Sequence, residues 1–247
     1  GIAINANSGN TNIYNNMVNL DLTTAPLPAA NGILTGADAL RAINLTSTAT
    51  INLYYNTIRL AGSGTGASFG TEGILRVGAG TFNLLNNIVQ NLCTTGTANV
   101  GIKGATGTVS SNYNDWVAPN QTLAQVITNT GAGQDANSIS VAPVFVNVAT
   151  SDLHLDINLN PLINDAGTVI AGYTDDIDGE VRPNGVAPDM GADEFAGVSE
   201  FYQSVITGLW SSAATWQTGP TAAGPWSPAT AAPTAGAKGI LIQAAHT

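Results

Sequence analysis

The sequence predicts an all-β solenoid, in which the chain winds into coils that stack on one another, and three observations support this prediction. Four segments align without gaps around a shared asparagine: 13–18, 53–58, 84–89 and 111–116. The shared asparagines lie 40, 31 and 27 positions apart, a drift that loops of different length explain. Within each segment the apolar residues alternate as in a β-strand, whose successive side chains point to opposite faces.

Each coil is expected to hold two or three short strands, separated by Gly, Asn and Thr. Inward side chains at matching positions should form continuous columns. One column is Ile13, Leu53 and Leu84, and a second is Val18, Ile58, Val89 and Trp116. A further strand upstream places Ile4, Leu75 and Ile102 at the same offset of 12 residues before the asparagine, with Leu40 displaced by an apparent insertion.

The shared asparagines are Asn16, Asn56, Asn87 and Asn114. Asparagine tolerates left-handed backbone geometry at a tight corner. Its amide also offers a donor and an acceptor to an identical side chain one coil away, as in other stacked β assemblies. We therefore expect a structural ladder of hydrogen-bonded amides along one corner.

The composition excludes several classes of partner. Only 9% of the 247 residues are charged, against about a quarter in ordinary soluble domains. A net charge of −10 with 6 scattered Lys and Arg argues against nucleic acid and against an anionic membrane surface. No apolar run is long enough to predict membrane insertion. The single cysteine excludes an internal disulfide framework and a multi-cysteine metal site, and we expect no cofactor.

The later part of the chain carries five ordered motifs, within 112–116, 142–147, 152–167, 176–183 and 189–195. With the coils before them, they resemble right-handed parallel β-helix proteins that bacteria secrete or display. The resemblance implies β-helix coils over 1–120 and, over 121–197, a terminal coil with a cap that closes the solenoid. It departs from the family at Asn160, where a serine usually precedes the proline. A cap is needed because the last coil would otherwise expose unpaired backbone and an apolar end.

One cation lies among the carboxylates of the expected cap. Arg182 is surrounded in the sequence by Asp175, Asp176, Asp178, Asp189, Asp193 and Glu194. We interpret Arg182 as joining two cap strands through carboxylates. The alternative is a calcium site at Asp176 and Asp178, because clustered carboxylates suit that ion, although the spacing of an EF-hand is incomplete.

The composition changes after residue 197. We expect a linker over 198–208, followed by a truncated β-rich repeat module over 209–247. A pair of tryptophans, a Pro-Thr-x-Gly turn and a hydrophobic strand resemble a repeat of large surface proteins exported by the type IX secretion system. Trp210, Trp216 and Trp226 belong either to the core of this module or to a sugar-stacking platform.

An active site is harder to find in the sequence. The acids of the coil region are Asp21, Asp38, Glu72 and Asp115, and they form no pair of the kind that a glycoside hydrolase needs. His154, His246 and Cys93 lack plausible catalytic neighbours. Arg41, Arg76 and Lys103 are expected to share the outer face of one sheet. Such a stripe could bind an anionic glycan, or it could simply be outward strand positions with long polar side chains.

These observations favour a non-catalytic, structural or adhesive segment of a large secreted or cell-surface bacterial protein. The alternative is a carbohydrate-active β-helix, either a polysaccharide lyase or hydrolase or a glycan-binding module. The expected partners are other domains of the same large protein, and surface polysaccharide or neighbouring surface proteins. The expected location is extracellular or at the cell surface, and we interpret the chain as a piece of a longer protein.

Overall fold

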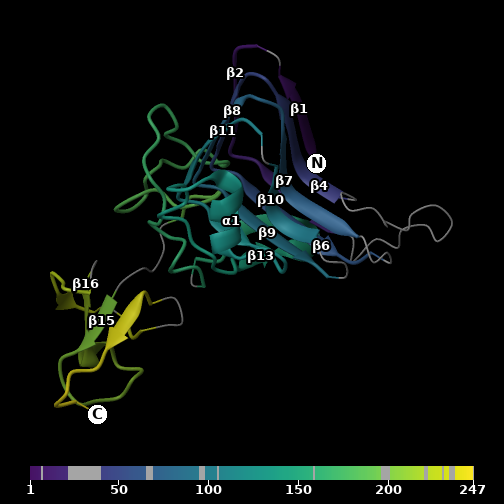
Figure 1. Ribbon diagram of the computed structural model, residues 1–247. Helices are drawn as coiled ribbons and strands as arrows, with labels where there is room; N and C mark the ends of the chain where they lie inside the picture. Colours follow the sequence, from purple (N-terminus) through teal and green to yellow (C-terminus); the bar gives the residue numbers. More distant parts are fainter. Residues whose placement is uncertain are drawn as a thin grey trace.

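The computed structural model describes residues 1–6, 8–21, 40–64, 69–94, 98–104, 106–157, 159–195, 201–219, 222–229, 231–233 and 237–246. The first part is a parallel β-helix, and a small β-unit follows it in the chain (Figure 1). The prediction of an all-β solenoid is confirmed. None of the helices in the described part of the chain is long and apolar enough to span a membrane.

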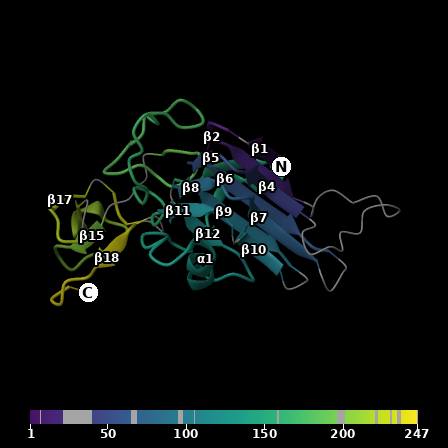
Figure 2. The same cartoon turned by 45° about the horizontal axis from the view of Figure 1, so that its top comes forward.

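Three 4-stranded sheets form the β-helix, and every pairing within them is parallel. The first sheet contains β1 (Ile2–Ala6), β4 (Leu40–Ser47), β7 (Gly70–Val77) and β10 (Ala98–Lys103). The second contains β2 (Asn10–Tyr14), β5 (Thr50–Tyr54), β8 (Thr81–Leu85) and β11 (Thr108–Asn112). The third contains β3 (Met17–Asp21), β6 (Thr57–Gly62), β9 (Ile88–Cys93) and β12 (Asp115–Val117). Consecutive strands lie in different sheets, so each strand pairs with its counterpart one coil away (Figure 2).

The two inward columns around the asparagine corner agree with the prediction. Ile13 pairs with Leu53 and Leu53 with Leu84, and all three are buried. The second column runs in register through Val18, Ile58, Val89 and Trp116. Because a parallel sheet repeats the same side chain in each coil, these columns form a continuous apolar core.

The predicted register of the first sheet is wrong by one residue. Ile102 pairs with Ile74, not with Leu75, while Ile4 is in register with Leu45 and, through it, with Arg76. The cause is the turn before the second sheet. By register this turn is one residue shorter after β4 than after β1, and again one residue shorter after β10 than after β7. A shift of one residue moves a strand side chain to the opposite face.

A helix covers the end of the core. Helix α1 (Leu123–Thr130) begins at Thr122, which forms a capping box with Gln125. Val126 of this helix is fully buried in the same hydrophobic cluster as the columns of the β-helix. No helix was expected in this range, yet α1 does what a cap must do, since it shields the apolar end.

The residues after the helix run along the side of the β-helix. We call residues 139–195 the side segment, and it includes β13 (Phe145–Asn147), the 3-10 helix η1 (Val148–Thr150) and β14 (Asp152–Leu155). Its first strand pair is antiparallel. It packs on the third sheet through a second hydrophobic cluster of Ile88, Leu155, Ile163, Met190 and Phe195.

Hydrogen bonds attach the side segment to every coil. In the first coil the Asn15 side chain donates to the Asp175 carbonyl, and in the second the Tyr55 hydroxyl donates to the Thr168 carbonyl. In the third coil the Asn86 amide also donates to Thr168, and in the fourth Trp116 N–H donates to the Ile139 carbonyl. The block expected to close the solenoid therefore lies along it, and α1 covers its end.

The last sheet has the order β17 (Ser227–Pro228), β16 (Trp216–Gly219), β15 (Phe201–Ser204) and β18 (Gly239–Leu241), with the 3-10 helix η2 (Ala213–Thr215) before β16. Strand β15 lies inside the range 198–208 that the sequence assigned to a linker, so the sheet uses part of that range. Trp216 is buried, whereas Trp210 is 51% exposed and half-buried Trp226 lies between these extremes.

Candidate functional site

The corner asparagines form one hydrogen-bonded column. Asn16 Nδ2 donates to Asn56 Oδ1 at 2.9 Å, Asn56 Nδ2 to Asn87 Oδ1 at 3.0 Å, and Asn87 Nδ2 to Asn114 Oδ1 at 2.9 Å. Asn56, Asn87 and Asn114 are buried, and each of them also donates to the carbonyl two residues before it. The column therefore satisfies the buried amides and holds the coils in register.

The left-handed residue at each corner is not the ladder asparagine but the residue before it. Asn15, Tyr55, Asn86 and Tyr113 have φ between 52° and 58°. The turn is made at these residues, which leaves the next side chain pointing inward to join the ladder. Two of these four residues are tyrosines, so packing outweighs the preference for asparagine at left-handed backbone positions.

A second column of asparagines lies on the outer face of the second sheet. Asn52 Nδ2 donates to Asn12 Oδ1 and Asn83 Nδ2 donates to Asn52 Oδ1, both at 2.7 Å. The sequence contains the signal, because each of these residues lies four positions before a ladder asparagine. Sequence reasoning missed it by following apolar residues alone.

The predicted stripe of three cations is only partly correct. Arg41 Nε lies 3.5 Å from Glu72 Oε2, and Lys103 Nζ lies 3.1 Å from Glu72 Oε1. Glu72 is fully buried between them. The two cations therefore share a carboxylate, which reduces the positive charge available to an anionic glycan.

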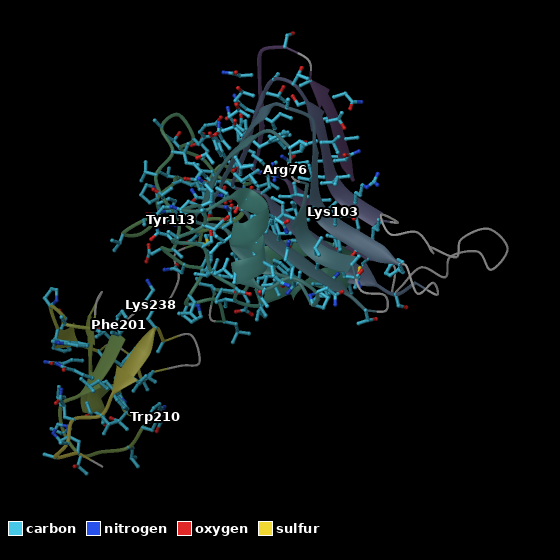
Figure 3. The ribbon with its side chains drawn as sticks, in the orientation of Figure 1. Arg76, Lys103, Tyr113, Phe201, Trp210 and Lys238 are labelled. Carbon is cyan, nitrogen blue, oxygen red and sulfur yellow. The ribbon has the colours of Figure 1, made fainter. Side chains whose placement is uncertain are left out.

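Arg76 does not belong to this face, so the prediction that it lies outward beside Arg41 and Lys103 is wrong. It is 2% exposed because the register shift turns it inward. Its guanidinium donates to the carbonyls of Gly104, Thr106 and Asn129 at 2.5, 3.2 and 2.9 Å. Burial lowers its pKa. Arg76 therefore joins β7 to the last turn of α1, whose carbonyls attract a cation, while Lys103 lies on β10 (Figure 3).

Arg182 has the structural role that the sequence indicated. Its Nη1 lies 2.9 Å from Glu194 Oε2, and both side chains are buried. Its Nη2 donates to the Gly191 carbonyl at 3.0 Å, and its guanidinium lies 4.3 Å from the centre of the Tyr55 ring. Arg182 thus joins two parts of the side segment and packs them on the second coil.

The two aspartates proposed as calcium ligands have different surroundings. Both carboxylate oxygens of Asp176 accept backbone N–H groups, from Asp178, Glu180 and Glu194. Asp176 therefore shapes the loop. Within the described residues, the group that could hold a metal ion joins Asp178 to His154 and Asp193, whose ligand atoms lie within 4.8 Å of one another.

His154 already bridges Asp178 of this group and a further carboxylate, that of Asp152. Its Nδ1 contacts Asp152 Oδ1 at 2.5 Å and its Nε2 contacts Asp178 Oδ2 at 2.7 Å. Desolvation lowers the pKa of His154, but the hydrogen bonds to both aspartates and the nearby negative charges outweigh it, so the pKa is raised. A protonated imidazole accounts for the geometry without an ion.

A pocket of about 420 Å³ lies between the first coil and the side segment, lined by Tyr14, Asn15 and residues 172–179. Tyr14 and Tyr54 are neighbours in the second sheet. The Tyr173 ring packs edge-on against both, with ring centres 4.9 and 5.2 Å away. The sequence could not indicate this pocket, because it joins the first coil to a loop that follows the last coil.

Comparison with protein-family models, curated proteins and solved structures finds no match. The fold class therefore rests on the strand pairing itself: three parallel sheets whose neighbouring strands come from successive coils. Fold alone does not determine function, so function has to be inferred from the geometry of the side chains.

Proposed function

We propose that this chain is a rigid, non-catalytic segment of a large bacterial protein that is secreted or displayed on the cell surface. The observation that carries the proposal is the ladder of Asn16, Asn56, Asn87 and Asn114, which continues through every coil. The side segment adds hydrogen bonds to every coil. Such an arrangement resists bending and shear, because each coil is fixed to the next by backbone, amide and apolar contacts.

The acids of the coil region support a structural role. Asp21 Oδ2 pairs with Arg59 Nη1 at 2.7 Å, Glu72 lies between two cations, and Asp115 is fully buried. Asp38 lies outside the described residues. Among the coil acids that the structure describes, none forms the open carboxylate pair that glycoside hydrolysis requires.

The export route is part of the proposal. The motifs after residue 197 resemble a repeat of surface proteins that use the type IX secretion system, and the 4-stranded sheet formed by these residues supports a β-rich module there. The other domains of the same protein are the proposed partners. A charge-poor surface rich in asparagine and threonine suits contact with polysaccharide or with neighbouring surface proteins.

Labelling of cells that produce the parent protein tests the location. Antibodies raised against this segment should label intact cells or the culture supernatant. Labelling that requires permeabilised cells would contradict the proposal. A parallel assay should incubate the purified chain with plant, algal and host polysaccharides, and we expect no release of reducing ends or unsaturated sugars. Sustained turnover would favour the enzyme alternative.

A further inference from the structure

The pocket at the first coil has an aromatic wall and a polar wall. Tyr14 is 49% exposed, and Tyr173 holds it edge-on at an interplanar angle of 81°. An exposed, fixed tyrosine ring offers a flat apolar surface with a polar tip. This surface suits the C–H face of a sugar ring.

The polar wall offers acceptors. The exposed side chains of Asp175 and Asp178 line the pocket, and no Lys or Arg is among its lining residues. Asn15 Oδ1 is buried and has no hydrogen-bond partner. A ligand in the pocket cannot reach a buried atom of this kind, so the acceptors open to a ligand are the two carboxylates. These groups favour a neutral ligand rich in hydroxyls and disfavour an anionic one.

The pocket is held in shape without a ligand. Asn15 Nδ2 donates to the Asp175 carbonyl at 2.7 Å, which ties the loop 172–179 to the first coil. The Asp176 carboxylate accepts N–H groups from Asp178 and Glu180, both at 2.8 Å. A preformed pocket loses less conformational entropy on binding.

We propose that this pocket binds a neutral saccharide, with a sugar ring stacked on Tyr14 and a hydroxyl group donated to the Asp175 carboxylate. This inference rests on the proposed surface role and deepens it by naming a ligand class and a site for the contact with polysaccharide. It also places carbohydrate binding at the Tyr14 pocket and not at Arg41 and Lys103, whose charge would select an anionic glycan.

The test uses the whole chain and an array of immobilised neutral, anionic and amino-sugar oligosaccharides, followed by titration of the strongest neutral ligand. Tyr14→Ala should weaken binding about tenfold, while Tyr14→Phe should retain it. Asp175→Asn should weaken binding through the lost charged acceptor. Leu92→Ala is the control, since it removes an exposed apolar side chain of β9 that does not line the pocket. Circular dichroism of each variant checks folding.

Three results would overturn the inference: no neutral oligosaccharide binds, only anionic glycans or basic peptides bind, or Leu92→Ala weakens binding as much as Tyr14→Ala. These results are distinct from failure of the proposed location. If the protein binds saccharide but antibodies label it only in permeabilised cells, saccharide binding at the pocket is supported and the surface location is contradicted.

Discussion

At the scale of single residues, the interior amides and the exterior amides have the same chemistry but different surroundings. Asn87 lies inside the corner, where its amide donates to Leu53 and Leu85 carbonyls and to Asn114. Asn83 lies on the outer face and donates to Asn52. Water can replace the partner of Asn83 but cannot reach the partners of Asn87.

Replacing Asn87 with alanine should therefore destabilise the protein strongly. The change leaves several buried carbonyl and amide groups without partners, and each costs about 1–3 kcal/mol. We expect Asn87→Ala to lower the free energy of unfolding by about 3 kcal/mol or more, measured by urea denaturation. Asn83→Ala is the control and should change it by less than about 1 kcal/mol. Equal losses in the two variants would show that the ladder has no special role.

The ladder and its flanking columns were predictable because the same residue recurs in each coil at a fixed distance from the asparagine. The inward positions of Ile13 and Leu53 follow from that repetition alone. Arg76 could not be placed in the same way, because a turn shorter by one residue reverses the face of the strand before it. The pocket at Tyr14 depends on a loop that returns from far along the chain.

At the scale of elements, the helix was missed although its start signal is in the sequence. Thr122 and Gln125 have the spacing of a capping box, and Leu123 and Val126 are spaced as on one helix face. Because strand motifs surround them in the sequence, a terminal coil was predicted for this range. Once α1 is in place, Arg76 becomes the link between it and the first sheet.

Replacing Arg76 should loosen this link. Arg76→Met keeps the apolar stem over the Phe82 ring but leaves the Gly104, Thr106 and Asn129 carbonyls without their donor. We expect a loss of about 2–4 kcal/mol in the free energy of unfolding and faster hydrogen exchange in α1. Arg41→Met removes a side chain that is 34% exposed and leaves Lys103 to pair with Glu72, so it should cost about 1 kcal/mol or less. Similar small effects for both variants would place Arg76 at the surface.

At the scale of the whole molecule, the side segment connects coils that are distant in sequence, and Arg182 holds it in place. Arg182→Met would leave Glu194 buried without its cation. Breaking a buried ion pair in this way costs about 3–5 kcal/mol. The double variant Arg182→Met/Glu194→Gln should recover part of that loss, because no charge is then left unpaired.

The control for Arg182 is Lys238→Met, since Lys238 Nζ pairs with Asp165 Oδ2 at 3.2 Å in a more exposed setting. Lys238 lies in the second β-unit (Figure 3), and its loss should cost about 1 kcal/mol or less. Limited proteolysis should cut the side segment faster in Arg182→Met than in Lys238→Met. Equal cleavage would contradict a locking role.

Buried acids make the stability of the whole protein depend on pH. Desolvation raises the pKa of Asp115 and of Asp189 to about 8, and that of Asp193 to about 6. The folded state therefore holds protons that the unfolded state has already released above its ordinary aspartate pKa of about 4. The free energy of unfolding must then fall as the pH rises from about 4 to about 8. The raised pKa of His154 acts in the same direction, because its stabilisation is complete below about pH 6.5 and is lost as the pH rises through the folded pKa.

We expect the melting temperature to be highest near pH 5 and to decline toward pH 8, since the lowered pKa values of Asp152 and Asp165 remove stability only in stronger acid. Asp115→Asn is the decisive variant, because Val141 N–H can still donate to the amide oxygen that replaces Asp115 Oδ1. It should flatten the decline by about 1 kcal/mol per pH unit. Thermal melts of both proteins between pH 4 and 9 measure the difference. A wild-type stability that rises from pH 5 to 8, or an unchanged slope in the variant, would show that Asp115 is ionised in the folded protein.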